Sequence, residues 1–397
     1  MPRTGKIIAT LAAIAFFSAG AETARSFGGT DAGKVSSPPP RSVSDTRSRT
    51  SAAPSSRTTA DIHAALESGR PREALEMLNS RTTDLRPVEK HSLEGRAYYL
   101  SGDLRQARHK LKAAVDERPK HAEDLYWLGR TYAKSNSPTL AATYYQRASW
   151  SGLDTADLHY DWAVALKEAG QLLGNISRRP QPGEEDQRLT CGGFVREGLV
   201  IGEVPSQQGW VIVSPVNSAI YQVHRALALE PEQPEALLLS GEVWLAVKRE
   251  KEAALAFARA FERLSKAEDL SRCHAGWAAS LLALGDVAGY LKHARKGMQA
   301  LGAVDSTAMA ACFASAAGAM ARRGDLPKQI RYLTLSVELW PRVDRLIELA
   351  DALVMAQRTH EANQYLKKAL AQNPSAQERR EIRQRLPRGS RLTPSTP

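Results

Sequence analysis

A pattern of small and large side chains recurs along this chain with a period of about 34 residues, and this period constrains the fold more than any single motif. The pattern is marked by alanines at Ala107, Ala141 and Ala253. Each marker has a large apolar residue four positions later, alanine seven positions later, glycine twelve positions earlier and an aromatic residue nine positions earlier. The equivalent sets are Leu111, Tyr145 and Phe257; Ala114, Ala148 and Ala260; Gly95, Gly129 and Gly241; and Tyr98, Tyr132 and Trp244. Because small residues let paired helices approach while a large residue fills the space between them, the pattern predicts stacked helix pairs.

The pattern resembles the tetratricopeptide repeat, a family of helix-turn-helix units that stack into a superhelix with an inner groove. A weaker first unit around Ala74 and a clear last unit around Ala362 extend the resemblance over residues 59–374. The resemblance implies an all-α fold, a right-handed α-α superhelix (solenoid) of about eight helix pairs. Prolines stand at unit boundaries, where a helix must end: Pro119, Pro231, Pro341 and Pro374. A helical repeat without a family relation is the alternative architecture.

Two units depart from the pattern. Gly285 and Gly324 mark their turns, but Tyr290 and Gln329 stand where the family has a small residue. After Pro374, a short polar helix over residues 375–386 is expected to cap the array, since a terminal repeat needs a polar outer face.

The regular spacing is interrupted after a helix expected over residues 157–170, because the matching second helix is expected near Pro215. Ala141 and Ala219 are 78 residues apart, which equals one repeat of 34 residues and 44 more, so residues 171–214 are interpreted as an insertion in a turn. The β-branched runs at 199–201 and 210–213 predict a two-stranded hairpin, joined by a turn at 205–209 and preceded by a disordered stretch over 178–187. The insertion is either a surface loop without further role or part of a binding face.

The N-terminus has the pattern of an export signal. Arg3 and Lys6 precede an apolar run over residues 7–21 that ends in Ala19-Gly20-Ala21, a sequence typical of signal peptidase sites. We expect a signal peptide over residues 1–21, cleavage after Ala21 and a secreted or periplasmic location, with an uncleaved anchor as the alternative. Residues 22–58 and 387–397 are rich in Ser, Pro, Thr and Arg and are predicted to be disordered. No transmembrane span is predicted, because no stretch reaches about 20 apolar residues.

The net charge of +11 comes mainly from the chain ends. Residues 1–60 carry 8 Lys and Arg against 3 Asp and Glu, and residues 375–397 carry 6 against 2. The remaining body has 40 basic against 38 acidic residues, which argues against a specific nucleic-acid surface. The basic tails leave binding of an anionic polymer as a weaker alternative function.

No catalytic or cofactor motif is present: GxGxxG, GxxxxGK[ST], HExxH, GxSxG and CxxC are all missing. We therefore expect no cofactor, no metal and no enzymatic activity. The three cysteines, Cys191, Cys273 and Cys312, are too few for a disulfide framework, and the latter two are expected to be buried. Three histidines share one repeat position and are interpreted as packing residues: His91, His159 and His274.

The resemblance also implies that partner-binding side chains come from the first helix of each unit. On that side the candidates are Arg96, Tyr99, Tyr126, Arg130 and Tyr160. Arg96 and Arg130 occupy equivalent positions of adjacent repeats, can form paired hydrogen bonds to carboxylates, and are not expected to fill packing positions. The asparagines of the family's carboxylate clamp are replaced here by Leu93, Arg96 and Trp127, so an adaptor for chaperone tails is not expected. An ordinary solvated face is the alternative interpretation.

Two classes of function follow. The first is a non-enzymatic scaffold of the cell envelope or secreted space that binds a peptide or protein segment in the concave groove. The second is an enzyme, or an accessory subunit of an envelope enzyme, that uses residues 171–214 as its working part. The missing catalytic motifs favour the first class.

Overall fold

The computed structural model describes residues 54–80, 85–173, 176–178, 193–195, 198–203 and 211–386. These residues belong to two compact units, one ending at Gly170 and the other beginning at Gln171. The predicted signal peptide, residues 22–53 of the predicted linker and the predicted C-terminal tail lie outside the described residues. The linker prediction is wrong for residues 54–58, which form the start of a helix, because proline at residue 54 suits the first position of a helix.

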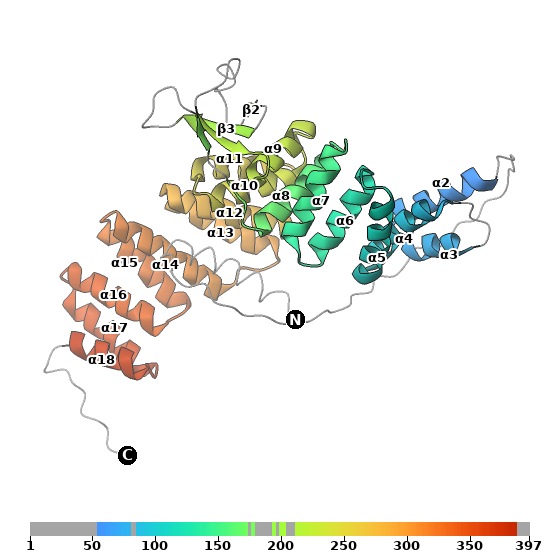
Figure 1. The fold of residues 1–397 in the computed structure, drawn as a ribbon. Coiled ribbons are helices and arrows are strands. Elements are labelled where there is room, and N and C mark those ends of the chain that lie inside the picture. Colours follow the sequence, from blue (N-terminus) through green and yellow to red (C-terminus); the bar gives the residue numbers. More distant parts are fainter. Residues whose placement is uncertain are drawn as a thin grey trace. The chain divides into compact units, whose positions relative to one another are not determined.

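The unit that ends at Gly170 is built from stacked helix pairs (Figure 1). Its described helices are α2 (Pro54–Glu67), α3 (Pro71–Asn79), α4 (Pro87–Ser101), α5 (Leu104–Glu117), α6 (Ala122–Lys134), α7 (Pro138–Trp150) and α8 (Ala156–Glu168). Helix α2 packs on α3, α4 on α5 and α6 on α7. The first helices of neighbouring pairs also touch, α4 with both α2 and α6, and α6 with α8. The predicted stacking is therefore present in this unit.

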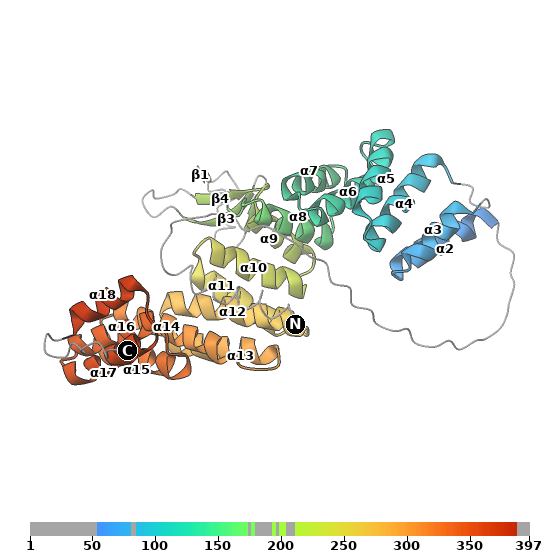
Figure 2. The same ribbon diagram turned by 90° about the horizontal axis from the view of Figure 1, so that it is seen from below.

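The second unit has the same construction (Figure 2). Its described helices are α9 (Ala219–Leu229), α10 (Pro234–Ala246), α11 (Glu250–Phe261), α12 (Ala267–Leu284), α13 (Val287–Ala300), α14 (Ser306–Arg322), α15 (Leu326–Leu339), α16 (Val343–Met355), α17 (Thr359–Ala371) and α18 (Ala376–Arg385). The pairs are α10 with α11, α12 with α13, α14 with α15 and α16 with α17, while α18 packs on α16 and α17. Apart from one small sheet, the described chain is helical, which confirms the predicted all-α class.

The repeat pattern marks the contacts between paired helices. The marker alanines Ala107, Ala141 and Ala253 are fully buried. A Cβ atom added to Gly95 would lie 2.5 Å from Leu111 Cγ, and one added to Gly129 would lie 2.7 Å from Tyr145 Cε1. Because real Cβ atoms do not approach so closely, glycine is what allows α4 to reach α5 and α6 to reach α7.

The departure at Tyr290 is compensated within the same helix. Tyr290 is 5% exposed at the position of the small residue, while Ala294, which is 2% exposed, stands where a large residue is expected. Large and small residues have exchanged places on α13. A swap that conserves volume keeps the helix pair filled, which explains why the unit folds in spite of its irregular sequence.

The turn within each pair contains a residue with left-handed backbone geometry. Gly102 and Gly285 adopt φ of 90° and 81° in such turns, whereas Lys248 and Gln357 adopt φ of 60° and 62°. For a residue with a Cβ atom this conformation costs about 1 kcal/mol.

We expect Lys248→Gly to raise the free energy of unfolding by about 0.5 kcal/mol, because relief of the strained turn outweighs the greater freedom of glycine in the unfolded chain. The side chain of Lys248 is exposed, so few contacts are lost. Urea denaturation measures the effect. The matched control is Lys112→Gly, at an exposed position in the interior of α5, where glycine should destabilise by about 1 kcal/mol. Destabilisation by Lys248→Gly would contradict the assignment of strain.

The interruption after α8 contains a small antiparallel sheet with the strand order β1-β4-β3-β2. Its strands are β1 (Ile176–Arg178), β2 (Gly193–Val195), β3 (Gly198–Glu203) and β4 (Val211–Pro215). The predicted hairpin is present as β3 paired with β4. Strands β1 and β2 were not predicted, because three residues are too short to show an alternating pattern. Of the stretch expected to be disordered, residue 178 belongs to β1 and the rest lies outside the described residues, as does the predicted turn at 205–209.

The two ends of the insertion meet at the start of α9. The backbone N–H groups of Ala219 and Ile220 donate to the carbonyls of Gln171 and Leu172 at 2.9 and 3.2 Å. Helix α9 starts at Ala219 rather than near the predicted Pro215, because Ser218 caps it by accepting from the N–H of its third residue. The insertion is therefore closed at its base by hydrogen bonds of α9.

The sheet packs on α9 through a few buried side chains. Leu199 of β3 and Ser214 of β4 are 0% exposed, and the hydroxyls of Ser214 and Ser218 are 2.6 Å apart. Both strands contact α9.

We expect that replacing residues 173–214 by a short Gly/Asn turn leaves the helices folded and lowers the melting temperature by less than about 5 °C, since the insertion contributes few core residues. Gln171 and Leu172 are retained because they accept hydrogen bonds from α9. Far-ultraviolet circular dichroism during heating measures the result. Loss of the helical spectrum would mean that the sheet belongs to the core.

Candidate functional site

Four of the five predicted partner-binding residues form one cluster on α4 and α6. Arg96 and Tyr99 come from α4, Tyr126 and Arg130 come from α6, and all four are partly buried. The fifth, Tyr160, lies partly buried on α8. The first helices of three successive units therefore carry the predicted residues.

Trp127 lies at the centre of this cluster. The guanidinium carbons of Arg96 and Arg130 lie 4.9 and 4.8 Å from the centroid of its ring. Arg130 also lies over Tyr99 at 5.2 Å and over Tyr126 at 5.6 Å. Contacts of this kind contribute about 0.5 to 2 kcal/mol each, so the rings hold both arginines in place.

Asp161 of α8 joins the cluster through Arg130. Its Oδ2 lies 3.3 Å from Arg130 Nε and accepts a hydrogen bond of 2.8 Å from the Tyr126 hydroxyl. Burial raises the pKa of Asp161, while Arg130 and the bond from Tyr126 act in the opposite direction. Burial also raises the pKa of Tyr126, so its hydroxyl stays protonated and donates. The cluster thus links α4, α6 and α8.

Arg96 and Arg130 were predicted to lie outside the packed parts of the structure, and this prediction is wrong. The side chains of Arg96 and Arg130 are 14% and 32% exposed, and both stack on Trp127. Arg96 has a long contact of 3.5 Å with Glu123, whose side chain is 61% exposed. The roles of Trp127 and Asp161 were not predicted from the sequence. One signal was available for the first, since Trp127 precedes Arg130 by three residues, a spacing that places both on one helix face.

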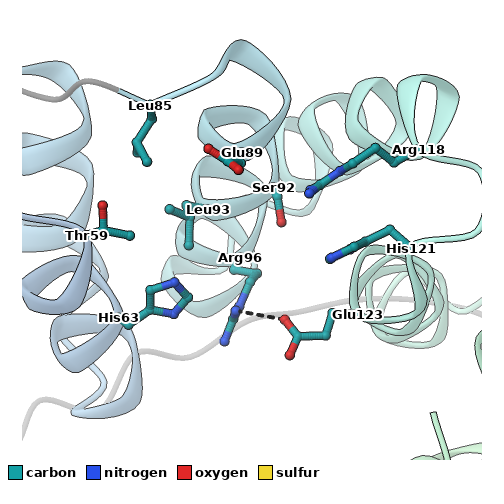
Figure 3. Close-up of a pocket in the computed structure, with 10 residues that line it drawn as sticks. All are labelled: Thr59, His63, Leu85, Glu89, Ser92, Leu93, Arg96, Arg118, His121 and Glu123. Atoms are coloured by element: carbon teal, nitrogen blue, oxygen red, sulfur yellow. Dashed lines mark hydrogen bonds and ion pairs between the residues drawn. The ribbon is translucent and has the colours of Figure 1, made fainter. Parts of the chain in front are cut away.

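A pocket of about 460 Å³ adjoins Arg96 (Figure 3). Its lining comes from α2, from α4 and the residues that flank it, from the end of α5 and from the start of α6: Thr59, His63, Leu85, Glu89, Ser92, Leu93, Arg96, Arg118, His121 and Glu123. This volume suits a small ligand or one or two side chains of a partner. Leucines and charged groups share the walls, so the pocket fits a group with both polar and aliphatic parts.

The fully buried carboxylate of Asp124 contacts three of the residues that line the pocket. Asp124 accepts hydrogen bonds from the Ser92 hydroxyl and, at 2.8 Å, from Arg118 Nη2, and it lies 3.0 Å from His121 Nδ1. These contacts fix Arg118 and His121 at the pocket. Among the described residues, the buried Nε atoms of Arg118 and Arg96 have no hydrogen-bond partner. The cluster and the pocket together offer aromatic faces, imidazoles and guanidinium donors, which recognise polar and planar groups.

The histidines and cysteines singled out above are packing residues where they are well buried. His159 and His274 are each 4% exposed and stack near Trp162 and Trp277. His91 is partly buried. Cys191 lies outside the described residues.

Cys273 and Cys312 are buried free thiols. Burial raises the pKa of Cys273 to about 12, so this thiol stays protonated at neutral pH. In the part of the chain that the structure covers, no group of three or more His, Cys, Asp or Glu residues could hold a metal ion. Within the same ranges, no helix is both long and apolar enough to cross a membrane.

The helix pairs and their packing define an α-solenoid fold. Residues 92–152, which span most of α4 through α7, match the family model of the tetratricopeptide repeat. This part of the chain therefore consists of tetratricopeptide repeats.

The chain is similar to a number of solved structures. The crystal structure of MamA is 15% identical, with 54% of this chain and 91% of that chain covered and a TM-score of 0.40. A tetratricopeptide repeat protein from Parabacteroides merdae is 14% identical, with coverages of 75% and 98% and a TM-score of 0.40. The APC/C hetero-tetramer Cut9-Hcn1 is 14% identical, with coverages of 74% and 48% and a TM-score of 0.41. No curated protein sequence matches the chain.

Proposed function

We propose that this protein is a non-enzymatic scaffold that binds a peptide or protein segment along the first helices of the unit ending at Gly170. One observation carries the proposal: partly exposed arginine and aromatic side chains of α4 and α6 gather next to a pocket of about 460 Å³. Tyrosine, tryptophan and arginine are the side chains most enriched where binding energy concentrates in protein interfaces.

The geometry supports recognition rather than catalysis. Stacking on Trp127 and pairing with Asp161 reduce the freedom of Arg130 before a partner arrives, so less entropy is lost on binding. A partner segment that lies across α4 and α6 meets the guanidinium groups that stack on Trp127 and reaches the pocket beside Arg96.

We further propose export of the chain to the secreted or periplasmic space, on the basis of the apolar run at residues 7–21 and its Ala19-Gly20-Ala21 ending. N-terminal mass spectrometry of exported material is expected to find Glu22 as the first residue. Recovery of exported chains that begin at Met1 or Pro2 would contradict cleavage.

The binding proposal is tested by photo-crosslinking in cells of the source organism. A photoreactive residue that replaces Tyr99 should become crosslinked to a partner protein, and one that replaces Tyr160 should become crosslinked to the same partner. Leu140, which is 48% exposed on α7, is the control position and should not become crosslinked to that partner.

The partner identified in this way is then titrated against purified variants. Arg96→Ala should weaken binding by about 1 to 3 kcal/mol, or roughly 5- to 150-fold, the usual effect of losing a charge-assisted contact. Arg108→Ala, which removes an exposed arginine of α5, should leave the affinity unchanged. Unchanged affinity of both Arg96→Ala and Tyr99→Ala would exclude this surface and make the insertion the leading candidate.

A further inference from the structure

Two buried histidines meet between α12 and α13, far along the chain from the proposed binding surface. His274 is 4% exposed, His293 is 8% exposed, and their Nδ1 atoms are 3.1 Å apart. Aromatic rings surround them: Trp277 lies 4.0 Å from His293 and Phe261 lies 4.9 Å from His274, measured between ring centroids. The pair is therefore a polar contact in largely apolar surroundings.

The contact depends on the protonation of both rings. An N–H···N bond needs one Nδ1 that carries a proton and one that does not, and two neutral histidines meet this need. A proton added to the accepting Nδ1 turns it into a second donor, so the hydrogen bond is lost. The added charge is also poorly solvated in this position.

The charged neighbours oppose protonation. Lys292 and Lys296 of α13 repel a positive charge on His293, whereas Asp286, at the start of the same helix, attracts it. Lys296 also repels a charge on His274. Phe261 of α11 and Trp277 of α12 also contact the two histidines, and both side chains are uncharged. Burial, then the partner imidazole and the two lysines, lower the pKa of His293 to about 4, and burial lowers the pKa of His274.

We propose that the His274–His293 contact makes the packing of α12 on α13 sensitive to pH, so that this helix pair loosens on acidification before the pair α16 and α17 does. The sign of this pH effect follows from the number of protons that the packed and the opened helices bind. An unfolded histidine has a pKa of about 6.5, so between pH 6.5 and about 4 the opened helices bind a proton that the packed pair excludes. The histidine contact contributes fully to the stability of the α12–α13 packing above pH 6.5, and this contribution is lost as the pH falls toward 4. The sole histidine of α16 and α17, His360, is exposed.

Hydrogen exchange of the full chain at pH 7.5 and pH 5.0, corrected for the intrinsic exchange rate, tests the proposal. Protection of peptides from α12 and α13 should fall about tenfold more than that of peptides from α16 and α17. Equal losses in the two helix pairs would overturn it, and this comparison needs no variant.

Two variants sharpen the result. His293→Phe keeps a ring against Trp277 and removes one of the two titrating imidazoles, so it should clearly reduce the extra loss in α12 and α13. His360→Gln is the matched control and should preserve that loss. If His293→Phe loses protection as strongly as the parent does on acidification, the histidine pair is not the sensitive element.

Discussion

Phe257→Ala is expected to lower the free energy of unfolding by about 3 to 5 kcal/mol, the range for removing a fully buried aromatic ring. Phe257 of α11 is 0% exposed. A Cβ atom on Gly241 of α10 would lie 2.7 Å from its ring, and one on Gly276 of α12 would overlap the ring as well. The ring therefore fills the space between two neighbouring helices, and its loss leaves a cavity that neither glycine can fill. Urea denaturation followed by circular dichroism measures the change.

The control and the rescue come from the same helices. Leu255→Ala removes a side chain that is 65% exposed and should change stability by less than about 0.5 kcal/mol. Gly276→Ala should destabilise the parent, where the added methyl meets Phe257, but should stabilise Phe257→Ala, where space is free. The same sign of effect in both backgrounds would show that Phe257 and Gly276 do not share one packing space.

Arg130→Ala is expected to cost about 2 to 3 kcal/mol of stability, because it removes the contacts with three aromatic rings and leaves Asp161 without its guanidinium partner. Asp161 is 24% exposed at its side chain, so water compensates for only part of the loss. Hydrogen exchange of peptides from α6 and α8 locates the effect in the unit that ends at Gly170.

A double-mutant cycle separates packing from charge. In the Asp161→Asn background, Arg130→Ala should cost less, because no unpaired carboxylate remains. Arg108→Ala is the surface control. If Arg130→Ala changes stability by no more than this control does, the cluster does not link α4, α6 and α8. Any binding defect of Arg130 variants must be compared with this stability loss, which makes Arg96 the better probe of the proposed partner surface.

The helix pairs were predictable because their contacts are encoded in residue size. Gly95 and Leu111, or Gly129 and Tyr145, are 16 residues apart in one helix-turn-helix unit, so the local spacing alone determines that they meet. The exchange of sizes at Tyr290 and Ala294 follows the same rule, but it is recognisable only once both positions are seen to be buried.

The site was only partly predictable, for a physical reason. The spacing of the repeat placed Arg96 and Arg130 on the same side of their helices, but the partners of Arg130 depend on how each helix is rotated about its axis. Asp161 lies 31 residues after Arg130 and meets it through the packing of α8 on α6, which no local pattern describes. Strands β1 and β2 were missed because three residues are too few to show an alternating pattern, and β1 in addition pairs with β4, which is distant in sequence.

The hydrogen-bonded base of the insertion makes residues 172 and 218 a natural entry point for foreign sequence. The chain leaves the solenoid at Leu172 and returns at Ser218, immediately before Ala219 and Ile220, which donate to the carbonyls of Gln171 and Leu172. A guest domain whose own termini are close together could replace the sheet there without separating the backbone groups that start α9. A fluorescent reporter carried at this point would leave both chain ends untouched and would report on the protein within cells.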